Sequence, residues 1–284
     1  MCLVEHGADV NKENRNGETP LFMACVRRNK DLVEYLVEHG ADINKKNQNG
    51  ETALFKACSS GNKDIVECLV EHGADINKEN KNGETPLFYA CRRGYTDLVE
   101  YLVEHGADIN KENWSGETVL FDECSSGNKD IVEYLMEHGA DINKENKNGE
   151  TPLFIACRSG NKDLIEYLVG HGADINKEYW NGETALFYAC RNGNKDLVEY
   201  LVEHGADINK ENRNGETALF KACSSGNKDI VEYLVEHGAD INKENRNGET
   251  LLFIACRSGN KDLIEYLVEH GADINKEYWN GKIY

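Results

Sequence analysis

Apolar residues recur along the chain in two short stripes separated by polar residues. In residues 47–79, both stripes follow the three- and four-residue spacing of an amphipathic helix. The first stripe consists of Leu54, Phe55, Ala57 and Cys58, and the second of Ile65, Val66, Leu69 and Val70. The pattern therefore predicts two helices in this stretch, each with one buried side.

Turn residues set the limits of these helices. The Asn-Gly pair that ends at Gly50 favours a tight reversal, because glycine adopts a positive φ without steric cost. Thr52 is placed to cap a first helix over residues 53–59, and Gly61 ends that helix. Gly73 supplies the left-handed residue that ends the second helix. One unit is expected to consist of a turn, a helix, a turn, a helix and a loop.

The same unit repeats along the whole chain. Its Asn-Gly-Glu-Thr core returns every 33 residues, with the glycine at Gly17, Gly50, Gly83, Gly116, Gly149, Gly182, Gly215 and Gly248. Full repeats are predicted over 14–46, 47–79, 80–112, 113–145, 146–178, 179–211, 212–244 and 245–277, with partial repeats at 1–13 and 278–284. Such short helices need neighbours, since even marginal stability in isolation takes roughly 12–15 residues. Stacked repeats must share a core, which predicts one all-α solenoid domain over residues 1–284.

Two segments of the unit carry a family resemblance. T-P-L-F-x-A-C and G-N-K-D-L-V-E-Y-L-V-E-H-G-A-D-I-N together resemble the ankyrin repeat, over essentially the whole chain. The resemblance implies antiparallel helix pairs with β-hairpin or turn tips on one side, in a curved array whose concave face binds other proteins. One departure is systematic. Where the family usually has histidine, this chain has Phe22, Phe55, Phe88, Phe121, Phe154, Phe187, Phe220 and Phe253, so we expect its repeats to depend more on apolar packing.

Residues that differ between repeats are the candidates for partner recognition, because the invariant ones build the scaffold. At the turn tips they include Trp114 and Trp180, and after the phenylalanine they include Tyr89, Asp122, Tyr188 and Lys221. The position after the phenylalanine also holds Met23, Lys56, Ile155 and Ile254, and the ends of the first helices hold Arg92, Arg93, Arg158 and Arg191. The resemblance places these residues on the tips and the concave side. Trp, Tyr and Arg are frequent interface anchors, although drift after duplication is the alternative explanation.

These observations predict a non-catalytic scaffold that binds a protein partner through its concave face and turn tips, without a cofactor. The recurrent carboxylates argue against an enzyme, because catalysis needs one asymmetric group of residues. The alternatives are a structural or assembly segment of a longer array, or an accessory domain of a larger protein. Since the variable Arg and Lys lie on the proposed binding side, the partner is expected to present an acidic surface or one that accepts aromatic side chains, and to bind more weakly at high salt.

The overall charge limits the classes of partner. The formal net charge is −19, from 51 acidic residues against 32 Lys and Arg, which argues against binding nucleic acid or an anionic membrane. No apolar run is long enough to span a membrane, and no secretory signal opens the chain. We therefore expect a soluble, cytoplasmic protein.

Cysteine and histidine recur at fixed positions of the repeat. Eight of the 10 cysteines share one position, and stacked helices about 8–10 Å apart keep them beyond disulfide reach, so reduced, buried thiols are expected. Cys68 and Cys2 stand elsewhere, and each remains a candidate reactive thiol. The nine histidines are too widely spaced for a zinc site, and we expect them to meet the negative ends of helices.

Two further features leave alternatives open. The spacing of Leu69, Asp75 and Asn77 is similar to that of sites modified by asparaginyl hydroxylases in ankyrin repeats, and the alternative is an asparagine that bonds its own loop backbone.

Neither end carries a polar capping repeat, so we expect a piece of a longer array, monomeric unless the ends self-associate.

Repeat 113–145 departs from the pattern in its core. Glu123 occupies the position at which the other repeats have alanine, and Asp122 precedes it. A buried carboxylate costs several kcal/mol unless it is paired or protonated. This repeat is therefore expected to form the weakest interface of the array, either as a tolerated, decayed copy or as a hinge.

Overall fold

The computed structural model describes residues 7–275, and the chain divides into two compact units, Met1–Lys147 (unit 1) and Asn148–Tyr284 (unit 2). The described part contains sixteen α-helices and no strand beyond the isolated bridge between Glu244 and Thr250. This confirms the predicted all-α fold, in which each repeat contributes a pair of helices. The prediction of a single domain over the whole chain stays a prediction.

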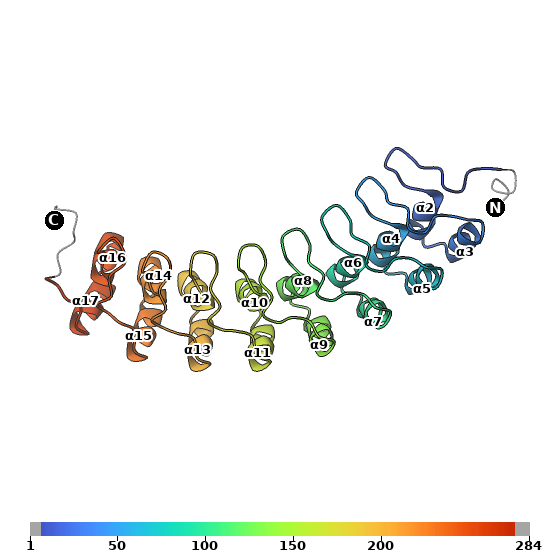
Figure 1. The fold of residues 1–284 in the computed structure, drawn as a ribbon. Helices are drawn as coiled ribbons and strands as arrows, with labels where there is room; N and C mark the ends of the chain where they lie inside the picture. Colours follow the sequence, from blue (N-terminus) through green and yellow to red (C-terminus); the bar gives the residue numbers. More distant parts are fainter. Residues whose placement is uncertain (1–6, 276–284) are drawn as a thin grey trace. The chain divides into compact units, whose positions relative to one another are not determined.

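In unit 1 the helices alternate between two rows (Figure 1). The first helices of its repeats are α2 (Pro20–Val26), α4 (Ala53–Ser60), α6 (Pro86–Arg92) and α8 (Val119–Ser126). The second helices are α3 (Lys30–Glu38), α5 (Lys63–Glu71), α7 (Thr96–Glu104) and α9 (Lys129–Glu137). The turn tip before each first helix projects beyond the first row. We call the first row with its tips the inner side, and the second row with its loops the outer side.

Unit 2 has the same two rows. Its inner side contains α10 (Pro152–Ser159), α12 (Ala185–Asn192), α14 (Ala218–Ser225) and α16 (Leu251–Ser258). Its outer side contains α11 (Lys162–Gly170), α13 (Lys195–Glu203), α15 (Lys228–Glu236) and α17 (Lys261–Glu269). The helices predicted from residues 47–79 are therefore present at the predicted places, and Gly61 ends the first of them in the left-handed region with φ 68°.

The capping residues differ from those that the sequence predicted. The side chain of Thr52 caps nothing, and its buried hydroxyl has no hydrogen-bond partner in the structure. Only Thr151 and Thr250, in unit 2, accept a hydrogen bond from the backbone of their own helices. Asparagine caps several second helices instead, as Asn62 does by accepting a hydrogen bond from the backbone of α5. Asn62 was missed because it lies in a turn that was assigned to glycine alone.

The predicted apolar stripes form the core, except that Val70 of the second stripe is only partly buried and that one further exception repeats. Leu54 and Phe55 have 0% exposure, as predicted for a shared core. In α10, however, Ile155 is 3% exposed while Phe154 is partly exposed, and α16 shows the same arrangement. Ile155 and Ile254 were expected at the variable surface, and that expectation was wrong. The helix turns its branched isoleucine inward, and the phenylalanine ring reaches the inner surface.

Within each unit, a ladder of asparagine side chains ties successive loops together. The Asn77 amide donates to the carbonyl of Gly106 at 2.9 Å, and its side-chain oxygen accepts from the backbone N–H of Asp108 at 2.8 Å. Asn209 makes the equivalent contacts in unit 2. The side chain of Asn77 therefore bonds the loop of the following repeat rather than its own. Whether it is hydroxylated stays open.

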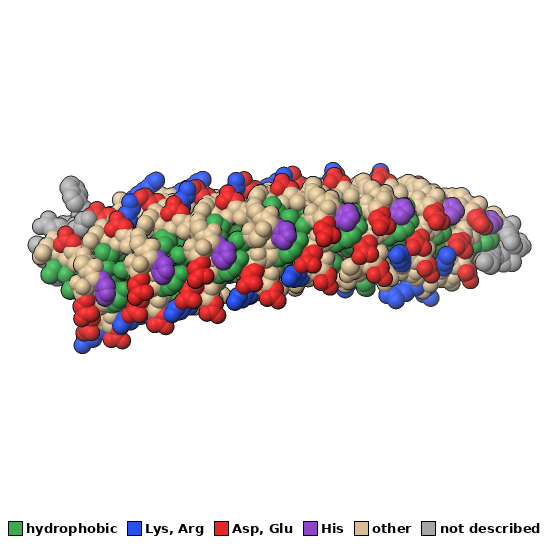
Figure 2. Space-filling model, turned by 90° about the horizontal axis from the view of Figure 1, so that it is seen from below, with side chains coloured by type: hydrophobic (Ala, Val, Ile, Leu, Met, Phe, Trp, Pro, Cys, Tyr) green, Lys and Arg blue, Asp and Glu red, His purple; other side chains and the backbone are tan. Residues whose placement is uncertain are grey.

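The outer side carries acids and histidines in rows, which Figure 2 shows over the second helices of each unit. Each histidine within residues 7–275 is the C-cap of a second helix and so meets its negative end, as predicted. His105, for example, donates from Nδ1 to the carbonyl of Tyr101 at 2.8 Å, and its ring stacks on the Tyr101 ring with centroids 3.9 Å apart. Among residues 7–275, no group of three or more His, Cys, Asp or Glu is placed to hold a metal ion. No helix of the described chain is long and apolar enough to cross a membrane.

The thiols give a direct test of this core. None of the nine described cysteines forms a disulfide, and eight of them are buried, whereas Cys256 is exposed. Burial raises the pKa of Cys25 to about 12, so little nucleophilic thiolate forms at neutral pH. Titration of the native protein with a thiol reagent is expected to label Cys256 first and to reach the buried set only after denaturation. In a Cys256→Ser variant, rapid native labelling of Cys58 would contradict the buried first helix.

Candidate protein-interaction surface

All ten predicted site residues lie on the inner side of their units. Unit 1 holds Tyr89 and Arg92 on α6, Arg93 at its end, Trp114 at a turn tip and Asp122 on α8. Unit 2 holds Arg158 on α10, Trp180 at a turn tip, Tyr188 and Arg191 on α12, and Lys221 on α14. The five site residues of unit 1 therefore share the inner side of that unit, and the five of unit 2 share the inner side of theirs.

A glutamate from each Asn-Gly-Glu-Thr core stands behind these residues. In the third full repeat, the Asn80 side chain accepts from the backbone N–H groups of Asn82 and Glu84, which shapes the turn. The Asn80 amide donates to Glu84 Oε2 at 2.9 Å, and Glu84 is only 7% exposed. The turn therefore fixes a carboxylate at the edge of the inner side.

In unit 1, Arg92 joins the turn glutamate Glu84 to the carboxylate of Asp122 on α8. Its guanidinium donates to Glu84 Oε1 and to Asp122 Oδ2, both at 2.8 Å. Burial would raise the pKa of Glu84, but the hydrogen bond and charge of Arg92 hold it below its usual value. Tyr89 donates its hydroxyl to Glu51 at 3.0 Å, and burial, with the charge of Glu51, raises its pKa to about 12. These residues form one connected network across adjacent repeats.

The inner cations of unit 2 are also paired with the chain's own glutamates. Arg158 lies 2.9 Å from Glu150. Arg191 lies 2.7 Å from Glu183, and Lys221 contacts both Glu183 at 3.2 Å and Glu216 at 2.6 Å. These side chains remain within reach of a partner, but their charge is largely neutralised. The sequence showed the cations at variable positions but did not show their partners. Each partner is a glutamate at an invariant position of the turn, which the sequence analysis assigned to the scaffold.

Four aromatic rings form a cluster on the inner side of unit 2. Phe154 stacks on Tyr179 with ring centroids 5.5 Å apart and meets Tyr188 edge-on at 5.7 Å. Tyr179 in turn contacts Trp180 at 5.7 Å. Sequence reasoning placed Tyr188 and Trp180 here, but it assigned Phe154 to the core. The Tyr-Trp pair of residues 179 and 180 recurs in the sequence at Tyr278 and Trp279, which lie outside the described residues.

The tryptophans at the turn tips are the most exposed large apolar residues of this side. Trp114 is 66% exposed and Trp180 is 57% exposed. The Trp114 indole lies over Gly83 of the preceding tip, where a Cβ would come within 2.6 Å of the ring. The ring is therefore held against a neighbouring tip with most of its surface accessible.

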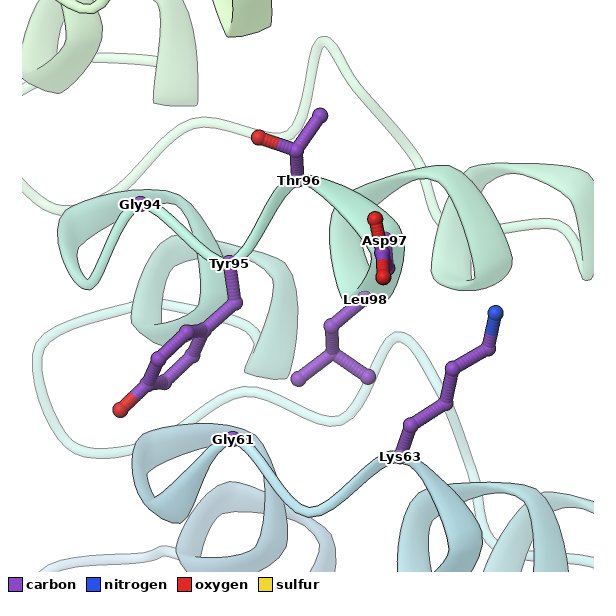
Figure 3. Close-up of a pocket in the computed structure, with 7 residues that line it drawn as sticks. All are labelled: Gly61, Lys63, Gly94, Tyr95, Thr96, Asp97 and Leu98. Carbon is purple, nitrogen blue, oxygen red and sulfur yellow. The ribbon is translucent and has the colours of Figure 1, made fainter.

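A cavity of about 350 Å³ opens elsewhere in unit 1, between the turns that precede α5 and α7 (Figure 3). Tyr95 stands where most repeats have an asparagine cap, and its ring covers Gly61. Lys63, Thr96 and Asp97 line the remainder. None of the lining residues pairs a nucleophile with a base, so the cavity offers no catalytic arrangement.

Comparison with known families agrees with this architecture. A family model described as "Ankyrin repeats (3 copies)" matches residues 1–80, 40–113, 77–146, 120–212 and 205–278. A search of curated proteins found no match. Because the family matches span nearly the whole chain and every described repeat has the paired helices, the chain belongs to the ankyrin-repeat family.

Proposed function

We propose that this chain is a non-catalytic scaffold that binds a protein partner through the inner sides of its units. Ankyrin repeats are generally protein-interaction modules. The observation that carries the proposal is the position of the variable aromatic residues, with Trp114 and Trp180 mostly exposed on the side where the repeats differ. Exposed tryptophans on a rigid support are typical anchors of protein interfaces.

The ion pairs of the inner side support a binding role. They hold Arg92, Arg158 and Arg191 in fixed positions before a partner arrives, which lowers the entropy lost on binding. The same pairing occupies the recurrent carboxylates and leaves them unsuited to acid or base catalysis. The unpaired cysteines support a reducing compartment, and we place the protein in the cytoplasm.

The test is capture of a partner by the intact chain, followed by titration to saturation. A variant carrying Trp114→Ala, Trp180→Ala and Tyr188→Ala is expected to lose at least tenfold in affinity. A matched variant carrying Lys162→Ala on the outer side is expected to bind normally, since that side chain is 71% exposed and far from the aromatic set in its repeat. Equal affinity of both variants, or concentration-dependent self-association in sedimentation without a saturable partner, would reject the scaffold in favour of an assembly role.

A further inference from the structure

The cations on the inner side of unit 2 fall into two groups. Those on the first helices are paired with turn glutamates, as shown for Arg158, Arg191 and Lys221, and Arg257 pairs with Glu249 at 2.9 Å. Those at the turn tips are different. Arg213 and Arg246 are exposed, and neither makes an ion pair with any residue of the described chain. On the inner side of unit 2, within the described residues, the positive charge that a partner can use without breaking an internal pair therefore lies at the tips.

These two arginines form a row with Trp180. The backbone N–H of Arg213 donates to the carbonyl of Asn181, in the same turn as Trp180, at 2.9 Å. The backbone N–H of Arg246 donates to the carbonyl of Asn214, in the next turn, at 2.8 Å. Consecutive tips are thus bonded to one another, which fixes the order of one tryptophan followed by two arginines.

The charge of the molecule is distributed unevenly between the two sides. The outer helix α13 carries Asp196 in its first turn and also Glu199 and Glu203, and α15 repeats this pattern. Figure 2 shows the resulting rows of acidic side chains over the outer side. An acidic partner is repelled there and attracted to the tips, so the field of the unit orients it toward this row.

We propose that the row Trp180, Arg213 and Arg246 binds an extended acidic segment of the protein partner. This inference rests on the proposed scaffold function and names the chemistry that the partner presents. An apolar side chain packs on Trp180, beside the rings of Tyr179 and Phe154. Carboxylates then meet the two guanidinium groups, whose planar donors suit bidentate pairing.

The spacing of the tips sets the spacing of the segment. Packed helices of successive repeats lie about 8–10 Å apart. A segment in the extended polyproline II conformation advances about 3.1 Å per residue with three residues per turn, so every third side chain faces the same way. The distance from one turn tip to the next is therefore spanned by three residues of the bound segment. The segment has an apolar residue, a carboxylate three residues later, and a second carboxylate three residues after that.

The probe is a fluorescein-labelled peptide, Ser-Leu-Ser-Ser-Glu-Ser-Ser-Glu-Ser, titrated into the full chain and followed by polarisation. A control peptide has the same composition with its two glutamates adjacent. Wild-type protein is expected to bind the spaced peptide several-fold more tightly than the control peptide. The double variant Arg213→Ala with Arg246→Ala is expected to lose about tenfold, and binding is expected to weaken as salt is raised.

The matched control variant is Lys195→Ala with Lys228→Ala, which removes the same charge from the outer side and is expected to bind as wild type does. Arg213→Lys with Arg246→Lys keeps the charge without the planar donors and is expected to fall between the two. The inference is overturned if the wild type prefers neither peptide, if both double variants lose affinity equally, or if a single-stranded oligonucleotide binds the tips more tightly than the peptide does. A captured partner that ignores the arginine variants but needs Trp114 and Tyr188 would overturn this inference alone, whereas the absence of any saturable partner would overturn the scaffold function.

Discussion

Replacing Glu123 by alanine is expected to stabilise repeat 113–145 by on the order of 3 kcal/mol at pH 7. Glu123 has 0% exposure, and its Oε1 has no hydrogen-bond partner in the structure. The hydroxyl of Ser126 lies 3.5 Å from Oε2, at the limit of a hydrogen bond. The equivalent positions of unit 1 hold Ala57 and Ala90, each fully buried, so the smaller side chain fits the site. The substitution removes a carboxylate with too few hydrogen bonds and replaces it with the side chain that the neighbouring repeats already pack at this position.

The size of the effect depends on pH. Burial, with a smaller contribution from Asp122, raises the pKa of Glu123 from 4.5 to about 8. Below pH 4.5 the carboxyl is protonated in both the folded and the unfolded state, and its ionisation costs nothing. Between pH 4.5 and 8 the unfolded state releases the proton while the folded state keeps it, so the free energy of unfolding falls by about 1.4 kcal/mol per pH unit. Above pH 8 the loss is complete.

Hydrogen exchange over residues 113–145 at pH 5 and pH 8 measures this effect locally. The wild type is expected to be better protected at pH 5, relative to the intrinsic exchange rate at each pH. Glu123→Gln serves as the control, since it keeps the size and polarity of the side chain but cannot ionise. Burial also raises the pKa of Asp122 despite its pairing with Arg92, so part of the pH dependence remains in every variant. Identical pH dependence in wild type and in Glu123→Gln would show that the carboxyl is not buried as described.

The fold was predictable from the sequence because one unit specifies it many times. Glycines at fixed intervals set the turns, and short apolar stripes leave stacking as the only way to bury them. The burial of Leu54 and the end of α4 at Gly61 both follow from residues within one repeat. Such local information is sufficient for a solenoid, in which most contacts join nearest neighbours.

The details of the site were less predictable because they depend on contacts between repeats. That Arg92 bridges Glu84 and Asp122 requires knowing which side chains adjacent helices bring together. Phe154 and Ile155 are both apolar, so hydrophobicity alone does not predict which of the two side chains is buried in the core. The structure buries Ile155 and leaves Phe154 partly exposed. The sequence identified the variable residues, but only the geometry separates the paired cations from Arg213 and Arg246.

The competition between isoleucine and phenylalanine leads to the second large effect that we expect. Phe55 has 0% exposure and contacts the ring of Tyr89 edge-on at 5.2 Å. Phe55→Ala is expected to destabilise unit 1 by about 3–5 kcal/mol, the usual cost of removing a buried phenylalanine. Phe154 is partly exposed, and Ile155 fills the core beside it. Phe154→Ala is therefore expected to cost less, roughly 1–2 kcal/mol, in proportion to the smaller apolar area that it buries.

The two substitutions are expected to separate stability from binding. Phe154 supports Tyr179 and Tyr188 through ring contacts, so its loss loosens the aromatic cluster beside Trp180 and weakens binding of the leucine-containing peptide. Phe55 lies in unit 1, and its loss is expected to leave peptide affinity unchanged at temperatures where the protein stays folded. Urea unfolding gives the stabilities and polarisation gives the affinities. A phenylalanine at the surface is expected to cost little stability and to support binding when it is present. If Phe154→Ala is instead as destabilising as Phe55→Ala and leaves peptide binding intact, Phe154 is a core residue like Phe55.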